Sequence, residues 1–206
     1  MDDEVEVRCD CGKVRGLVAR LTRAQVNHLA CYCEDCRAFL RFLEREDLLD
    51  DHGGTTIVQL SPYTVRFEQG ASELCCMRLS PKGMIRWYAG CCQTPMGNTL
   101  SAGITFAGLT ASTLQLSPEE RQARLGPALK GNLQGAQNGP PPDEHPTSFA
   151  RLIAKVIGRM VKWKVLSLVV DRGKASPYFD ASGAPRATPK VLTLEERRAL
   201  LARDQG

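Results

Sequence analysis

The chain has 206 residues, 43% of them hydrophobic and 24% charged, a composition that is typical of a folded globular protein and not of a disordered one. It contains no apolar run near the roughly 18 residues of a membrane span, and no apolar segment follows its acidic start, so we expect no transmembrane segment, no secretory signal and a cytoplasmic location. Up to Phe106 there are 12 basic and 14 acidic residues, against 15 and 9 beyond it; such an asymmetry more often reflects a solvated face than an anionic partner, and we expect no nucleic-acid partner.

The first predicted hairpin contains a C-x-C pair. Residues 4–8 alternate polar and apolar side chains, as a half-buried strand does, and residues 13–20 are predicted to return as the second strand. Between them lie Cys9 and Cys11, whose side chains point the same way on an extended backbone. Gly12 follows, and it can take the positive φ of a tight turn around a metal.

A second cysteine group follows the next predicted strand, at residues 27–31. Cys31, Cys33 and Cys36 form the pattern C-x-C-x-x-C, which places three thiols within six residues. The apolar side chains of residues 37–50 then recur at helical spacing, which predicts a short helix or helical turns.

Residues 57–107 contain several short β-type runs separated by glycine and proline turns. The doublet Cys91 and Cys92 lies among them, after a predicted strand. We therefore predict a mainly β fold, with a β domain over residues 1–107.

The remaining residues, 108–206, are predicted to form a mostly helical, loop-rich extension packed on this domain. Capping boxes begin short helices at Ser117 and Thr193, ending near Leu125 and Ala202. A longer amphipathic helix is predicted over residues 149–161, with its basic side chains on the face opposite Phe149, Leu152, Ile153, Val156, Ile157, Met160 and Val161. We expect the apolar face to cover the β core or to form a contact in a homodimer; an anionic membrane surface is the alternative.

The nine cysteines all lie between Cys9 and Cys92. Their odd number argues against a fully paired disulfide framework, and their short spacings are typical of metal ligands in an intracellular protein. The plainer alternative, a set of small buried hydrophobic residues, suits Cys75 and Cys76 better than the group at 31–36.

Two zinc sites account for most of these thiols. In one, Cys9 and Cys11 bind Zn²⁺ together with the Cys91–Cys92 region, which closes a long loop and stabilises the fold. Adjacent side chains on a strand point to opposite faces, so Cys91 joins Cys92 only where the backbone bends; Cys75 or Cys76 is otherwise the remaining ligand. In the other, Cys31, Cys33 and Cys36 bind Zn²⁺ and leave the fourth position open, as in catalytic zinc sites.

The order C-x-C-G at Cys9, C-x-C-x-x-C-R at Cys31 and C-x-T at Cys92 resembles the glutathione-dependent formaldehyde-activating enzyme family, which is grouped with centromere protein V. The resemblance covers residues 5–107. It implies a zinc-bound, β-tent-like fold in which Cys9, Cys11 and Cys92 are structural ligands and Cys31, Cys33 and Cys36 hold a catalytic zinc. The implied activity is that of a carbon–sulfur lyase, run in reverse to join formaldehyde and glutathione into S-(hydroxymethyl)glutathione.

We therefore expect a zinc enzyme acting on a small-molecule thiol or thiol adduct, bound at the open position. A non-catalytic, zinc-stabilised binding module is the first alternative, and a thiol redox protein whose cysteine pairs cycle without metal is the second. Glu34, Asp35 and His52 are candidate proton carriers by position, although solvated loop charges and a turn residue are the plainer interpretations. His52 is also a candidate fourth ligand of the second zinc, and Arg37 is a candidate partner of the thiolates or of a substrate carboxylate.

Overall fold

The fold was analysed in a computed structural model, which describes residues 4–142 and 148–202. The chain is mainly β, with two sheets and a helical C-terminal part, as the sequence predicts. Its strands are β1 (Glu4–Arg8), β2 (Arg15–Ala19), β3 (Asn27–Cys31), β4 (Thr55–Leu60), β5 (Val65–Gln69), β6 (Leu74–Arg78), β7 (Ile85–Ala89), β8 (Thr94–Thr99), β9 (Ala107–Thr110), β10 (Leu129–Gly131) and β11 (Lys190–Val191).

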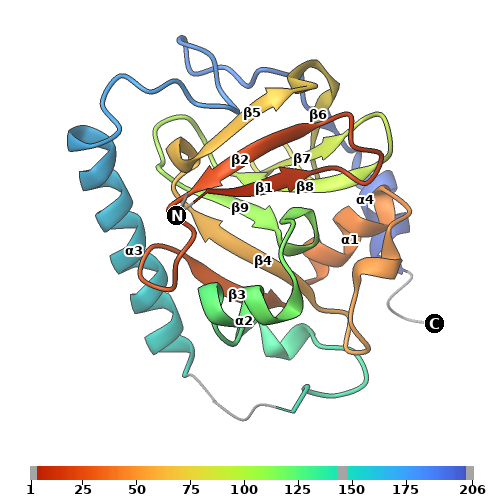
Figure 1. Cartoon of the computed structure of the whole chain (residues 1–206). Coiled ribbons are helices and arrows are strands. Elements are labelled where there is room, and N and C mark those ends of the chain that lie inside the picture. Colours follow the sequence, from red (N-terminus) through yellow and green to blue (C-terminus); the bar gives the residue numbers. More distant parts are fainter. Residues whose placement is uncertain (1–3, 143–147, 203–206) are drawn as a thin grey trace.

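The smaller sheet has the order β1-β2-β5 and is antiparallel throughout. Its inward side chains, such as Val7, Val18 and Val65, pack against Trp87 and Met96 of the larger sheet in one hydrophobic core. Figure 1 shows the three strands lying across the β7–β8 part of the larger sheet. The alternation of buried and exposed side chains along β1 and β2 explains why one face of this sheet enters the core.

The larger sheet has eight strands in the order β10-β3-β4-β9-β8-β7-β6-β11. Its six inner strands are antiparallel, whereas β10 joins β3 and β11 joins β6 in parallel. Both outer strands come from the predicted extension, so residues beyond 107 complete the sheet at its two edges.

Three short helices lie around the larger sheet: α1 (Glu34–Phe42), α2 (Pro118–Leu125) and α4 (Leu194–Ala202). Helix α2 has the predicted capping box, in which Ser117 and Glu120 exchange hydrogen bonds. At the start of α4, Thr193 and Glu196 make the same exchange. Helices α1 and α4 pack together beside β6, as Figure 1 shows at the right of the view.

Helix α3 runs from Phe149 to Val169, eight residues beyond the predicted end. The extra turns contribute Trp163, which is fully buried and donates a hydrogen bond from Nε1 to the carbonyl oxygen of Gln25 at 2.8 Å. The prediction that its apolar face packs on the domain is wrong for the outer part of that face: Leu152 is buried, but Phe149, Ile153, Ile157 and Val161 are exposed. The helix turns a second apolar stripe inward, because Trp163 lies in line with Leu152 at helical spacing.

Among the residues that the structure describes, no helix combines the length and the apolar character needed to cross a membrane.

Candidate metal centres

The structure gathers seven of the nine cysteines into two groups. In the first, the sulfur atoms of Cys9, Cys11, Cys91 and Cys92 lie within 4.8 Å of one another. Cys11 and Cys91 are 80 residues apart in sequence, yet their Sγ atoms are 3.4 Å apart. Four thiols converging in this way could hold one metal ion in a closed, tetrahedral set.

Two tight turns bring these thiols together. Gly12 has a φ of +76° and donates its backbone N–H to the carbonyl oxygen of Cys9, while the N–H of Val14 points at Cys9 Sγ at 3.2 Å. Cys91 and Cys92 lie in the turn between β7 and β8, closed by the N–H of Gln93 donating to the carbonyl oxygen of Ala89. The backbone bend that Cys91 needs in order to join Cys92 is therefore present, and both neighbouring thiols face the same point.

The remaining two thiols, Cys75 and Cys76, belong to β6 and join neither group. Cys76 is buried, and its thiol donates to the carbonyl oxygen of Ala187 at 3.2 Å. Cys91 is therefore the fourth member of the first group, and Cys75 and Cys76 are not.

The first group favours thiolate at Cys92. Burial raises the pKa of the Cys92 thiol, but hydrogen bonds from Thr94 and from the backbone of Cys11 lower this pKa to about 6. The Thr94 hydroxyl lies 3.1 Å from Cys92 Sγ and also accepts the backbone N–H of Asp10 at 3.0 Å. Thr94 therefore links both halves of the group.

In the second group, the sulfur atoms of Cys31, Cys33 and Cys36 also lie within 4.8 Å of one another. The Sγ atoms of Cys31 and Cys33 are 3.5 Å apart. No further His, Cys, Asp or Glu among the described residues 4–142 and 148–202 joins them. Three thiols in this arrangement could hold a metal ion and leave one position to another ligand.

The second group is built where β3 leads into α1. Cys31 is the last residue of β3, between Thr55 of β4 and Gly131 of β10. Cys33 precedes α1, and Cys36 lies in its first turn, with its N–H donating to the carbonyl oxygen of Cys33. The positive end of a helix dipole favours negative charge here, so this position suits thiolates.

One thiolate is favoured in this group. Hydrogen bonds from Cys33 and Cys36 lower the pKa of Cys31 to about 2, and a contact from Asn132 Nδ2 at 3.4 Å acts in the same direction. The hydrogen bonds to Cys31 in turn raise the pKa of Cys33 to about 11 and that of Cys36 well above its usual value. Of the three thiols, Cys31 is therefore the one whose thiolate its neighbours stabilise most.

A hollow of about 340 Å³ opens beside the three thiols. Its walls are mostly apolar, and part of them is supplied by Phe149, Leu152, Ile153 and Val156 of α3. Ile57 of β4 and Phe106, which precedes β9, also line it. A ligand in the position left open by the thiols would therefore meet an apolar chamber with few polar groups.

The other predicted residues lie at different places. Asp35 lines the hollow and accepts a hydrogen bond from Arg197 at 3.2 Å, whereas Glu34 does not line it. His52 contacts the carbonyl oxygen of Gly139 through Nδ1 and belongs to neither thiol group. Arg37 is buried and donates from Nη1 to the carbonyl oxygens of Tyr32 and Gly135, which braces the loop that carries Cys33.

The sequence patterns did not predict the polar residues Arg86, Asn98 and Asn132 of this site. Arg86 of β7 and Asn98 of β8 are buried side chains that line the hollow, and Asn132 contacts Cys31. The side-chain oxygen of Asn98 is buried and has no hydrogen-bond partner among the described residues. These residues come from distant strands and loops. Only Asn132 carries a local signal, because asparagine is typical of turns and tolerates the positive φ of +57° found here.

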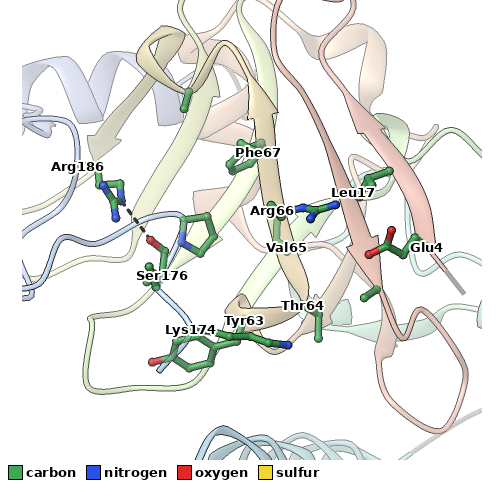
Figure 2. A pocket seen from close by; sticks show the side chains of 14 residues that line it. Glu4, Leu17, Tyr63, Thr64, Val65, Arg66, Phe67, Lys174, Ser176 and Arg186 are labelled. Carbon is green, nitrogen blue, oxygen red and sulfur yellow. Dashed lines mark hydrogen bonds between the residues drawn. The ribbon is translucent and has the colours of Figure 1, made fainter. Parts of the chain in front are cut away.

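A larger hollow of about 600 Å³ lies elsewhere, along the edge strand β5 of the smaller sheet (Figure 2). It is lined by Val65 and Phe67 of β5 and by the segment around Ser176, which accepts a hydrogen bond from Arg186 at its carbonyl oxygen. None of the described residues that line it is a cysteine.

The fold and the site together define a mainly β protein with two cysteine groups that could each hold a metal ion. Residues 1–188 match a family described as a family of unknown function, DUF6151, and the chain belongs to that family. No curated protein matches the chain. A crystal structure titled only as a Rhodobacter sphaeroides protein and structural genomics target is similar over 61% of this chain and 99% of its own, at 17% identity and a TM-score of 0.42. Neither match names an activity, so the resemblance to formaldehyde-activating enzymes stays a prediction.

Proposed function

We propose that the chain is a zinc enzyme of the carbon–sulfur lyase type, acting on a thiol adduct such as that of glutathione and formaldehyde at Cys31, Cys33 and Cys36. The observation that carries the proposal is the combination of three convergent thiols with an adjoining hollow of about 340 Å³. The resemblance of the cysteine pattern to formaldehyde-activating enzymes points to the same chemistry.

The donor sets support zinc as the metal. Thiolates are soft ligands, and tetrahedral sets of four cysteines are typical of structural zinc, whereas three protein ligands and an open position are typical of catalytic zinc. In this proposal, Cys9, Cys11, Cys91 and Cys92 hold the structural ion. When bound by the other three cysteines, Zn²⁺ would lower the pKa of a substrate thiol placed in its open position.

The surrounding side chains have separable roles. Cleavage breaks the carbon–sulfur bond, the adduct hydroxyl gives up its proton to form the aldehyde, and the sulfur departs as a thiolate. Asp35 lines the hollow and is the carboxylate placed to take that proton. Arg86 lies 3.9 Å from Asp35 and can stabilise negative charge that develops on the substrate oxygen.

The apolar walls restrict the substrate. Arg86 is the only cationic residue among the described residues that line the hollow, and the buried oxygen of Asn98 favours a hydrogen-bond donor on the ligand. The hollow therefore suits the small hydroxymethyl–sulfur end of the adduct, and the charged groups of glutathione would lie outside these walls.

The first experiment measures zinc stoichiometry on the wild type and on Cys33→Ser, with Cys75→Ser as the matched control outside both groups. We expect two zinc ions in the wild type and in the control, and one in Cys33→Ser with the fold intact. A zinc content unchanged in Cys33→Ser would remove the metal site and the enzyme proposal with it.

A second experiment separates an enzyme from a binding module. In the Co²⁺-substituted protein, an added thiol should change the visible absorption of the metal if the fourth position is open. The exchange of ¹³C-formaldehyde with glutathione, followed by NMR, then tests catalysis directly. A spectrum that no thiol alters would indicate a fourth protein ligand and favour the binding module.

A further inference from the structure

Helix α3 carries an apolar stripe that faces away from the protein. Phe149, Ile157, Val161, Val165 and Leu168 have exposed fractions of 65%, 55%, 59%, 55% and 63%. At 3.6 residues per turn, their spacing places them along one side of the helix, over about 30 Å of its length. Figure 1 shows α3 at the outer edge of the molecule, at the left of the view.

The opposite side of α3 already anchors the helix. Leu152 and Trp163 are buried, and Trp163 donates to the carbonyl oxygen of Gln25. Arg159 and Lys162 donate to the carbonyl oxygens of Arg23 and Ala24. Packing on this chain therefore does not explain the outer stripe, because the helix is held without it.

The charge of α3 is of one sign. Its 21 residues include Arg151, Lys155, Arg159, Lys162 and Lys164 and no acidic residue. On the helical wheel, Arg151 borders the outer stripe and Lys164 projects within it, whereas Lys155, Arg159 and Lys162 lie on the side that faces the protein. Long basic side chains beside an apolar stripe can bury their stems and keep their charges at an aqueous boundary.

We propose that the outer stripe of α3 lies on an anionic lipid surface, with the helix parallel to the membrane plane. Exposed apolar side chains enter the boundary of the acyl chains, and the flanking lysine and arginine side chains meet the lipid phosphates. A second copy of the chain fits less well, because two such helices face to face would bring like charges together without a carboxylate on either helix to pair with them.

The stripe is continuous with the hollow beside Cys31, Cys33 and Cys36. Phe149 and Ile153 belong to the exposed side of α3 and also line that hollow. A membrane beneath α3 would therefore lie next to the wall of the candidate site. Binding to the surface depends only on α3 and does not depend on the metal chemistry proposed above.

The test is sedimentation of the full chain with vesicles of phosphatidylcholine alone and with 30% phosphatidylserine. We expect binding to the anionic vesicles that weakens at high salt. Ile157→Glu combined with Val161→Glu should reduce the partition coefficient more than about tenfold, because two apolar contacts are replaced by repelled charges. The matched control is Leu194→Glu, an apolar residue of α4 that is 62% exposed and lies away from the stripe.

A charge-matched pair of variants tests the basic border. Arg151→Gln with Lys164→Gln should weaken binding about fivefold for each charge removed. Lys82→Gln with Arg198→Gln changes the net charge equally at exposed positions outside α3 and should leave binding almost unchanged. Circular dichroism checks that each variant is folded.

Three outcomes would overturn the proposal. The wild type could leave anionic vesicles unbound; the control variants could lose binding as much as the α3 variants; or light scattering could show a dimer that Ile157→Glu with Val161→Glu dissociates while vesicle binding persists. The last result would assign the stripe to a contact between copies of the chain.

Discussion

The two cysteine groups use the same ligand chemistry in opposite settings. Cys9 and Cys11 meet Cys91 and Cys92 across about 80 residues of chain, at a partly exposed edge where two hairpin turns meet. Cys31, Cys33 and Cys36 lie within six residues and adjoin an apolar hollow. A metal that joins distant segments stabilises the fold, whereas a local set beside a hollow leaves room for a ligand.

The largest expected effect is that of Cys92→Ser on stability. Binding of structural zinc provides about 10 kcal/mol or more that is coupled to folding in small zinc domains, and the unfolded chain cannot hold these distant thiols together. We expect the variant to lose one zinc and its cooperative thermal unfolding, measured by calorimetry. Wild-type melting behaviour in Cys92→Ser, with Cys75→Ser as control, would break the distinction between the two groups.

Asp171→Asn tests whether the ion pair at the end of α3 stabilises the fold independently of the metal sites. The Asp171 side chain is completely buried, and its carboxylate accepts two hydrogen bonds from Arg20 at 2.7 and 2.8 Å. Removing a buried partner should lower the free energy of unfolding by about 3 kcal/mol. Urea unfolding measures this loss, and zinc content should not change. A loss of zinc in this variant would mean that α3 and the metal sites are not independent.

The same carboxylate predicts a dependence of stability on pH. Burial raises the pKa of the Asp171 carboxyl group, but hydrogen bonds from Arg20 and Lys174 hold this pKa below its usual value. A lowered pKa in the folded state stabilises the protein above the unfolded pKa of about 3.9, and this contribution is lost as pH falls through the folded value. The difference between wild type and Asp171→Asn should therefore be constant above about pH 5 and shrink below about pH 4. A difference that grows with acid would contradict the assigned ion pair.

Cys33→Ser should cost much less stability than Cys92→Ser, about 1 kcal/mol, the ordinary effect of a substitution. Because its three thiols are close in sequence, the unfolded chain would also bind zinc there, and binding to both states would cancel in the stability. Parallel melting curves of the two variants sharpen the comparison. Equal losses would show that both groups are structural.

The smallest expected effect is that of Asn132→Gly on the local metal affinity. Glycine keeps the positive φ of this position and removes only the contact between Nδ2 and Cys31 Sγ. Loss of a supporting contact of this kind typically weakens metal binding about tenfold. Competition with a chelator should detect the change at one of the two sites only. Asn138→Gly, at an equal φ of +57°, is the control that should bind both metals as tightly as the wild type.

Local patterns determined much of this protein. The alternation in residues 4–8, the capping boxes at Ser117 and Thr193 and the spacing of Cys31, Cys33 and Cys36 involve neighbours within a few residues, so the sequence alone predicted the strand, the helices and the three-thiol group. The mainly β class followed from the same short-range periodicity.

Tertiary structure decided what depends on distant segments. Cys91 joins its group because a turn between β7 and β8 bends the chain. The spacing of the cysteines alone did not decide whether Cys91, Cys75 or Cys76 is the fourth member. Arg86, Asn98 and the residues of α3 that line the hollow converge from separate elements, and no local pattern relates them. The orientation of α3 also depends on distant segments. The periodicity of the sequence predicts an amphipathic helix, but the burial of Trp163 determines which side of it faces the protein. The reason is that the packing free energy depends on the surface that the rest of the fold presents.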